Sequence, residues 1–343
     1  MLSLSDYRYI TPKKMLNYLS VWYPRSRKKI NINAYPSHIF LEPTSRCNSN
    51  CRLCPSGGGI RSSFPQGDLT FANAKKIIDT NKEYLFSISF WNWGEPLLNS
   101  DIFSMTGYAH KCGIKTALAT NLHAFHDGMI EPLFACGLDD LNVSCHAASS
   151  ETYTQYQPGM SFDTLQNAVD LIAQTKRRLR RSRPVIHLTF AITKKNRHEI
   201  REMNALCARF RARPNMYYAS LNLRFCKNSD EIQKRIEEWT PDPTRGIGMP
   251  GKISYYSTAA NTGILPPTYS CCTDPFTTMV IRWNGDVSAC CTDYHGHALG
   301  NALSQDLKEI WNGRSYVDLR RFIVSGGKTE IDPSAPCNGC VML

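Results

Sequence analysis

The sequence predicts an α/β fold, a partial (β/α)6 barrel followed by a small C-terminal domain that contains a β-hairpin and a helix. Short apolar runs alternate with helical patterns six times between residues 38 and 225. This alternation implies a parallel sheet with right-handed crossovers. A proline-containing stretch then separates these repeats from a cysteine-rich tail with its own hairpin signal. At 343 residues, the chain can form one large domain and a smaller appendage.

Six segments have the apolar pattern of strands. They are residues 38–42, 85–91, 115–120, 140–144, 185–191 and 217–225. The first helix is expected to begin after Thr70, a residue type favoured at N-caps, and to run through Ile77 and Ile78. Later helices are predicted near residues 102–111, 129–135, 162–181 and 199–210. In such a barrel, the chemical groups belong on loops at the carboxyl ends of the strands.

Four segments are predicted along the chain. They are a basic helical extension (1–36), the barrel (37–228), a linker (229–270) and the C-terminal domain (271–343). The linker begins with a charged helix, residues 231–239, and continues with several prolines. These boundaries follow from the break in the strand–helix alternation.

Two basic clusters leave alternatives open. The extension either covers one end of the barrel or contacts a membrane surface or an anionic partner through Arg25, Arg27, Lys28 and Lys29. The run 176–183 is typical of a solvated helix end, with a docking patch for an acidic partner as the alternative. The sequence does not decide either case.

Composition narrows the class of protein. No apolar run is long enough to span a membrane, and the N-terminus lacks the apolar core of a secretory signal. Fourteen cysteines without such a signal indicate reduced, metal-binding thiols and a cytoplasmic location. The net charge of +11 fits an anionic substrate, and it fits simple solubility equally well. No aromatic and basic motif indicates a nucleic-acid partner.

A cysteine triplet follows the first predicted strand. Cys47, Cys51 and Cys54 have C-x3-C-x2-C spacing on a loop. Three thiolates at this spacing can hold three corners of a [4Fe–4S] cube and leave one iron open to a small molecule. Zinc also uses C-x2-C pairs, so a half zinc site is the alternative. The full spacing, placed directly after a strand, favours the iron–sulfur cluster.

This strand and triplet resemble the start of the radical S-adenosylmethionine (SAM) superfamily. The resemblance implies a partial TIM-like barrel and a cluster whose open iron is chelated by SAM. It also implies reductive cleavage of SAM to a 5′-deoxyadenosyl radical, which takes a hydrogen atom from substrate. The electron is expected from an external flavodoxin or ferredoxin. One departure is Leu53, where the family usually has an aromatic residue.

A SAM pocket is expected at the ends of the next three strands. Gly94, Glu95 and Pro96 match the family's G-E-P motif, in which the backbone and the glutamate hold the SAM amino group. By resemblance, Thr120, Asn121 and Ser144 line the SAM carboxylate and ribose. Weaker candidates are Asn142, Asn196 and Glu199. His146 stands where many relatives have an acidic residue, which leaves the ribose contacts there open.

The C-terminal seventy residues predict a second metal centre. Asn284-Gly285 is a strong hairpin signal. Cysteine pairs flank this hairpin, and C-x2-C closes the chain. The pattern resembles the SPASM/twitch extension, and the shorter twitch form with one auxiliary [4Fe–4S] cluster fits best. Its expected ligands are Cys272, Cys290, Cys337 and Cys340. Cys271 and Cys291 are the alternatives at the first two positions, and a zinc ribbon is the alternative site.

Most of the remaining cysteines are expected in the core. Cys145 and Cys226 differ because each lies near the predicted carboxyl end of a barrel strand. A thiol there can return a hydrogen atom to a substrate radical, so both are candidate catalytic residues. Arg224, in the same region, is a candidate partner for an anionic substrate group.

These features predict a radical SAM oxidoreductase or epimerase. The expected substrate is a small hydroxylated metabolite, such as a sugar, a cyclitol or a nucleotide sugar. Four thiolate ligands leave no open iron on the auxiliary cluster, which suits it to electron transfer and favours dehydrogenation. The alternatives are epimerisation or cross-linking of a ribosomally made peptide and, from another class, a non-catalytic metal-binding or electron-transfer protein.

Overall fold

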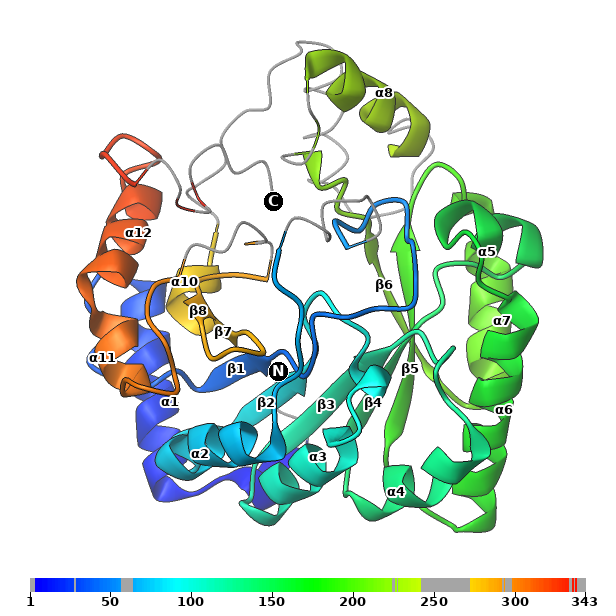
Figure 1. Ribbon diagram of the computed structural model, residues 1–343, viewed down its shortest axis with the longest axis horizontal. Helices are drawn as coiled ribbons and strands as arrows, with labels where there is room; N and C mark the ends of the chain where they lie inside the picture. Colours follow the sequence, from blue (N-terminus) through cyan, green and yellow to red (C-terminus); the bar gives the residue numbers. More distant parts are fainter. Residues whose placement is uncertain are drawn as a thin grey trace.

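A computed structural model describes residues 4–27, 29–56, 64–223, 226, 228–241, 272–291, 293, 298–332, 335 and 337. Its centre is an eight-stranded sheet with the order β6-β5-β4-β3-β2-β1-β7-β8 (Figure 1). The strands are β1 (His38–Leu41), β2 (Ser87–Phe90), β3 (Lys115–Thr120), β4 (Asp140–Ser144), β5 (Val185–Ile192), β6 (Arg213–Tyr218), β7 (Met279–Ile281) and β8 (Val287–Ser288). Strands β1 to β6 pair in parallel and in chain order. The predicted parallel α/β core is therefore confirmed.

Helices cover the outer side of the curved sheet (Figure 1). The α-helices are α1 (Pro12–Ser26), α2 (Phe71–Asn81), α3 (Ile102–Lys111), α4 (Ile130–Ala135), α5 (Ser150–Tyr156), α6 (Phe162–Arg178), α7 (Ile200–Phe210), α8 (Ser229–Trp239), α10 (Asp274–Thr277), α11 (Leu307–Asn312) and α12 (Arg314–Val324). Short 3-10 helices are η1 (Leu4–Tyr9), η3 (Pro96–Leu98), η4 (Asp127–Met129) and η5 (Arg197–Glu199). Thr70 caps α2 as expected, because its side chain accepts a hydrogen bond from the Asn73 backbone N–H at 3.2 Å.

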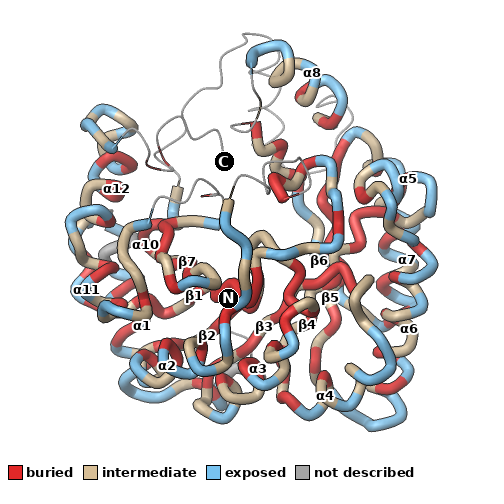
Figure 2. The backbone as a smooth tube through the Cα atoms, in the orientation of Figure 1, coloured by how far each residue is buried: buried red, intermediate tan, exposed pale blue. Residues whose placement is uncertain are grey.

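Alternation along the strands separates an apolar outer face from an inner face that carries most of the polar side chains. Ile39, Leu41 and Ile88 are fully buried beneath the helices, and Figure 2 shows the buried stretches along the strands. The residues between them face the concave side, which we call the lumen. Phe40 is one of these, and Asn142 is another. This pattern places the core between sheet and helices and leaves the lumen for chemistry.

Strand β6 corrects the sequence-based prediction. We expected a strand at 217–225, but the strand begins at Arg213 and ends at Tyr218. It lies at the edge of the sheet and contains Pro214, which edge strands tolerate. Its exposed polar residues hide the apolar pattern on which the prediction depended. Consequently Cys226 lies eight residues beyond the strand, and Arg224 lies outside the described residues.

The C-terminal hairpin is continuous with the barrel sheet. Strand β7 pairs in parallel with β1, matching Ile39 with Met279 and Leu41 with Ile281, and β8 pairs antiparallel with β7. The predicted hairpin turn is present, and its Gly285 has φ of +88°, a conformation that glycine adopts readily. The hairpin therefore extends the β1 edge of the barrel.

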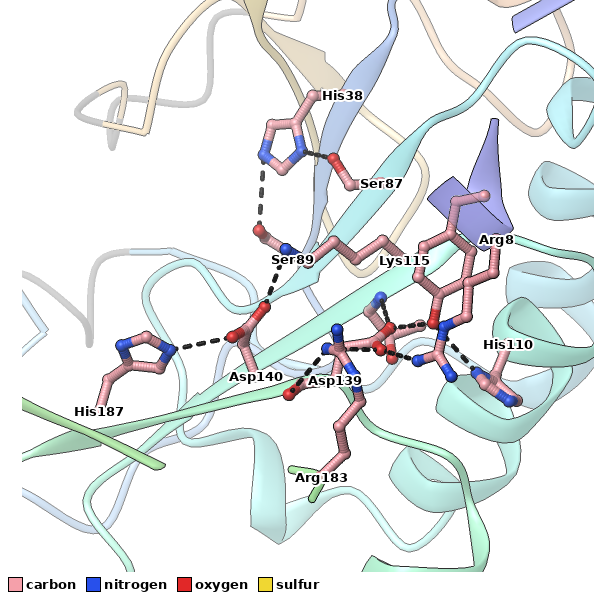
Figure 3. A network of polar contacts seen from close by, with 12 residues as sticks. Arg8, His38, Ser87, Ser89, His110, Lys115, Asp139, Asp140, Arg183 and His187 are labelled. Atoms are coloured by element: carbon pink, nitrogen blue, oxygen red, sulfur yellow. Dashed lines mark hydrogen bonds and ion pairs between the residues drawn. The ribbon is translucent and has the colours of Figure 1, made fainter. Parts of the chain in front are cut away.

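Asp139 anchors the N-terminal extension to the barrel. This carboxylate is fully buried, and it accepts hydrogen bonds from the Tyr9 hydroxyl at 2.5 Å and the Thr116 backbone N–H at 3.0 Å. Arg8 also pairs with it, and Arg183 pairs at 2.8 Å (Figure 3). Two guanidinium groups and two further donors satisfy the buried charge.

No helix among the described residues has the length and apolarity to cross a bilayer.

Candidate active site

The cysteine triplet lies directly after β1 and lines a cavity of about 460 Å³. The Sγ of Cys51 is 3.1 Å from the Ser49 hydroxyl, and the Cys54 backbone N–H donates to the Cys51 carbonyl at 3.1 Å. Burial, together with the nearby thiols of Cys54 and Cys47, raises the pKa of Cys51 to about 12. Thiols that resist ionisation in this way become thiolates when a cationic centre binds them. The three side chains thus fit a cluster as their common partner.

The G-E-P loop is clamped against the cysteine loop. A Cβ on Gly94 would lie 1.9 Å from the carbonyl oxygen of Thr44, so no larger residue fits there. The next backbone N–H, that of Glu95, donates to the Arg46 carbonyl at 2.8 Å. This contact joins the loop after β2 to the residue that precedes Cys47. The predicted SAM-binding motif therefore lies beside the predicted cluster.

Glu95 joins the predicted SAM residues into one network. Its Oε1 accepts hydrogen bonds from the Thr120 hydroxyl at 2.6 Å and the Leu97 backbone N–H at 3.1 Å. Its Oε2 accepts from the Asn121 backbone N–H at 2.8 Å. Burial raises the pKa of Glu95 to about 7 despite these donors. An amine bound in the cavity would supply the missing positive charge, which is the role expected of the SAM amino group.

The cavity has walls from the ends of β2 to β6. Its lining residues are Cys47, Ser49, Cys51, Cys54, Trp91, Asn92, Trp93, Gly94, Glu95, Ala119, Thr120, Asn121, Asn142, Ser144, His146, Tyr156, Gln157, Thr189, Asn215 and Tyr217. The set includes the predicted Ser144 and Asn142, together with the triplet, Gly94 and Glu95. Pro96 begins η3 and is buried behind the loop. The predicted SAM residues are therefore gathered around one cavity.

His146 lies two residues beyond β4 and lines the cavity. Its backbone is left-handed, with φ of +54°, and its Nδ1 accepts the Ala191 backbone N–H at 3.1 Å. Burial lowers the pKa of His146 to about 4, so the ring is neutral and its proton is on Nε2. The ring packs against Tyr156 with centroids 4.7 Å apart. It therefore brings a neutral N–H donor to the cavity.

Asn196 and Glu199 support the loop after β4 and are absent from the cavity lining. The Asn196 amide donates to the His146 and Ala191 carbonyls, each at 2.8 Å. The Glu199 carboxylate accepts from the Ala148 backbone N–H at 2.7 Å. These contacts fix His146 in its unusual conformation.

The two candidate hydrogen-atom donors lie in different surroundings. Cys145 follows β4 as expected, but it is buried in the main core, and its thiol donates to the Ala147 carbonyl at 3.1 Å. It belongs to the outward-facing set and does not line the cavity. Cys226 packs against an apolar cluster that contains Leu53 of the cysteine loop. Neither thiol is among the residues that line the cavity.

The lumen contains a charged network next to the cavity (Figure 3). Asp140 on β4 is 2.9 Å from Nε2 of His187 and 3.2 Å from Nζ of Lys115. Burial opposes ionisation of Asp140, but the hydrogen bond from His187 and the charge of Lys115 prevail and hold its pKa below the usual range. His187 is paired in register with Asn142, a cavity-lining residue. His187 and Asp140 thus lie on the strands that form the cavity wall, next to a residue that lines it.

The C-terminal cysteines are partly described. Cys337 is buried in the main core, Cys272 packs against that core, and Cys290 is partly buried. Cys291 is exposed, and Cys271 and Cys340 lie outside the described residues. Nowhere in the described ranges do three cysteine, histidine or acidic side chains converge on a point that would hold a single metal ion. A cube of four irons is wider than one ion, so its ligands stand farther apart.

Several cavity residues were missed by sequence reasoning. Trp91 and Thr189 continue the inward alternation of β2 and β5, so that alternation could have identified them. Asn215 and Tyr217 were lost because β6 was predicted too late in the chain. Gln157 is buried at the end of α5, a helix that was not predicted. All five residues line the same cavity as the SAM motifs.

Comparison with known proteins agrees with this geometry. Residues 41–207 match the family model described as the radical SAM superfamily, and residues 271–341 match SPASM, an iron–sulfur cluster-binding domain. An AdoMet-dependent heme synthase of Methanosarcina barkeri is 36% identical over 38% of this chain, although the match spans only 37% of that protein. The mycofactocin maturase MftC of Mycobacterium tuberculosis is 23% identical over 90% of this chain and 78% of its own length.

A solved structure shares the fold. Streptococcus suis SuiB bound to the precursor peptide SuiA superimposes with a TM-score of 0.63 and 16% sequence identity, over 91% of this chain and 71% of that one. The two family models imply SAM, a SAM-binding [4Fe–4S] cluster and auxiliary [4Fe–4S] clusters as cofactors. The chain belongs to the radical SAM superfamily of enzymes and has a C-terminal SPASM domain.

Proposed function

We propose that this enzyme oxidises a secondary alcohol of a small hydroxylated metabolite, such as a sugar, a cyclitol or a nucleotide sugar. The observation that carries the proposal is the polar lumen beside the SAM motifs. Inward positions on β2 to β5 provide hydroxyl, amide and charged groups. These include Ser89, Asn142, Thr189 and the Asp140 network. A polyhydroxylated substrate can exchange its hydrogen bonds with water for bonds to these groups.

Roles at the SAM end follow from the contacts. Cys47, Cys51 and Cys54 would hold the cluster, and Glu95 would orient the SAM amine, with Thr120 and Asn121 fixing its carboxylate. Ser144 and His146, which line the same cavity, would contact the SAM carboxylate and ribose. Bound there, these cofactors supply a 5′-deoxyadenosyl radical as the hydrogen-atom acceptor. Gly94 lets the loop approach close enough to place them.

Oxidation to a ketone removes one hydrogen atom, then one proton and one electron. The geometry offers a proton acceptor in His187, whose Nε2–H donates to Asp140 and leaves Nδ1 with a lone pair. The electron requires a second redox centre, which we assign to one auxiliary cluster held by Cys272, Cys290, Cys337 and Cys340. Epimerisation needs a thiol that returns a hydrogen atom to the substrate radical, and Cys145 is packed in the core. Its position therefore favours oxidation over epimerisation. Cys226 remains the candidate donor for an epimerase.

An external one-electron carrier of the flavodoxin or ferredoxin type would reduce the first cluster. A groove of about 910 Å³ on the outer side of the cysteine loop fits this partner, because Cys51 is part of its wall. Its rim carries Arg52, Lys195, Lys234 and Arg235 against two glutamates. Such a basic rim favours the acidic surfaces of these carriers. Reduced thiols at both centres fit a reducing compartment such as the cytoplasm.

Modification of a ribosomally made peptide is the second candidate. The relative MftC, called a maturase, aligns over 90% of this chain and supports this alternative. The cluster and SAM would occupy much of the 460 Å³ cavity, so its volume does not separate the two substrate classes. The polar inward side chains of the lumen, among them Asn142 and Thr189, favour a hydroxylated metabolite.

The test begins with anaerobic reconstitution, iron counting and dithionite-driven SAM cleavage. We expect about eight irons per chain and formation of 5′-deoxyadenosine. Polyols deuterated at each carbinol carbon are then screened, and the correct substrate transfers deuterium into 5′-deoxyadenosine and yields a ketone. Transfer from a peptide alone would overturn the metabolite assignment. Product that retains the alcohol with inverted configuration would replace oxidation by epimerisation.

A further inference from the structure

Exposed large apolar side chains are concentrated in one short part of the molecule. Six of the nine that the described residues contain lie between residues 7 and 23. Five of them are on α1, and four of these have exposed fractions near half or above: 67% for Leu16, 49% for Leu19, 50% for Trp22 and 51% for Tyr23. Tyr18, also on α1, is exposed to a lesser degree. Isolated exposed apolar residues are ordinary, but a contiguous set indicates an interaction surface.

These residues form one side of the helix. Leu16, Leu19 and Tyr23 have i, i+3, i+7 spacing, and Trp22 lies beside them. We call this set the outer face of α1. The opposite side contains Lys14, which is buried beneath the helix. The helix therefore directs its apolar side to solvent and a charged side chain to the protein, the reverse of the usual arrangement.

Specific polar contacts fix this orientation. The Lys14 ammonium donates to the Gly113 carbonyl at 2.5 Å. The Asn17 amide donates to the Tyr35 carbonyl at 3.1 Å and accepts the Tyr35 backbone N–H at 3.0 Å. Rotating α1 to bury its apolar side would break these bonds and expose Val21, which is buried. The outer face is therefore held outward by the fold.

Positive charge surrounds the outer face. Residues 1–36 contain seven lysines and arginines and one aspartate, so they supply +6 of the net +11. Arg27 and Lys29 lie over the ring of Tyr23, at 5.9 Å and 5.2 Å from its centroid. Leucine, tryptophan and tyrosine next to lysine and arginine are typical of helices that lie in the interface of a bilayer.

We propose that the outer face of α1 binds the surface of a membrane that contains anionic lipids. The apolar side chains would enter the boundary between headgroups and acyl chains, and Arg27 and Lys29 would remain among the headgroups. A second copy of the chain suits this face poorly, because a two-fold contact would bring Arg27 and Lys29 of both copies together. The proposal does not depend on which substrate the enzyme oxidises.

Sedimentation with vesicles tests the proposal on the reconstituted full-length enzyme. The vesicles are phosphatidylcholine alone or mixed with phosphatidylglycerol. We expect binding to the anionic vesicles, weakened by salt, and a loss of at least about tenfold in Leu16→Glu/Trp22→Glu. Both positions are exposed, so the fold should be retained. The matched control is Leu179→Glu/Val324→Glu, which adds the same two negative charges at exposed apolar positions outside α1.

Each other outcome overturns the proposal. Wild-type protein that stays in solution with anionic vesicles shows that the face does not bind lipid. Equal loss in Leu179→Glu/Val324→Glu assigns any binding to net charge alone. Light scattering without vesicles measures the molar mass of the wild type and of the α1 variant. A wild-type dimer that becomes a monomer in the variant assigns the face to a second copy of the chain. Unchanged SAM cleavage in the variant shows that the active site is intact.

Discussion

The Thr120 hydroxyl donates a 2.6 Å hydrogen bond to Oε1 of Glu95, and this bond joins the end of β3 to the loop after β2. The donor and the carboxylate are both buried, so the bond fixes the carboxylate where the cavity meets the cysteine loop. Glu95 has no cation among its described partners. This arrangement predicts that the carboxylate binds a positively charged group of a ligand.

The first prediction concerns this pair. Thr120→Val removes one donor to a buried carboxylate and should weaken SAM binding by about 1.5–3 kcal/mol, while iron content stays unchanged. Glu95→Gln should reduce SAM cleavage by at least about 100-fold because the neutral amide cannot balance the amine. Equilibrium binding of SAM and iron counts check both variants. Normal SAM affinity in Glu95→Gln would contradict the assignment.

SAM binding should also depend on pH through Glu95. Its pKa of about 7 in the free protein means that the carboxyl takes up a proton as the pH falls through 7. The protonated carboxyl group has no negative charge to attract a cationic amine, so the affinity for SAM should decrease from pH 8 to pH 6. Glu95→Gln should remove this dependence. An equal pH slope in both proteins would assign the effect to another group.

Gly94→Ala should disrupt the site because the added Cβ would lie 1.9 Å from the Thr44 carbonyl oxygen. The loop must move away from the cysteine loop, so we expect loss of SAM cleavage and a lower thermal midpoint. Gly107→Ala is the matched control, since its Cβ would be 3.7 Å from the nearest atom and it lies within α3. That variant should be neutral or stabilised by up to about 1 kcal/mol. Similar damage in both would show that the close approach at Gly94 is not responsible.

Neighbouring cysteines provide a sharp test of the second centre. Cys290→Ala should remove about four irons and leave SAM cleavage by dithionite intact. Cys291→Ala should keep all the iron, because Cys291 is exposed beside the hairpin. Iron counting and electron paramagnetic resonance of the reduced proteins distinguish the two. The reverse pattern would exchange the ligand assignment.

The sequence was sufficient for much of the site because its chemistry is local. Each motif of the site spans only a few consecutive residues: the triplet, the G-E-P loop and the ends of β3 and β4. The sheet register then brings these motifs together. Strand β6 was misplaced because an edge strand with Pro214 lacks an apolar pattern. The pairing of β7 with β1 links segments about 240 residues apart, and no local signal encodes that contact. The outward direction of Cys145 depends on the strand's inward–outward alternation, and its position after β4 alone did not indicate it.

Electron delivery should depend on the groove beside Cys51. Lys234 lies on its rim and is exposed on α8. Lys234→Glu should reduce turnover supported by flavodoxin or ferredoxin by about tenfold at low salt, and leave dithionite-supported cleavage unchanged. Arg201→Glu makes the equivalent change on α7, outside the groove. Equal loss in both variants, or none in either, would place the donor elsewhere.

The last prediction separates radical formation from substrate oxidation. Asp140→Asn removes the acceptor that orients His187 and neutralises the partner of Lys115. SAM cleavage should continue, because Asp140 is not among the residues that line the cavity. Ketone formation should decrease by about 100-fold, a typical loss for a proton acceptor, so cleavage becomes uncoupled from product. The control is Lys115→Met, which breaks the other ion pair and leaves the His187 contact in place. If the two variants lose product equally, the network maintains the shape of the lumen and His187 is not the base. If only Asp140→Asn loses product, the orientation of the imidazole matters and His187 accepts the proton.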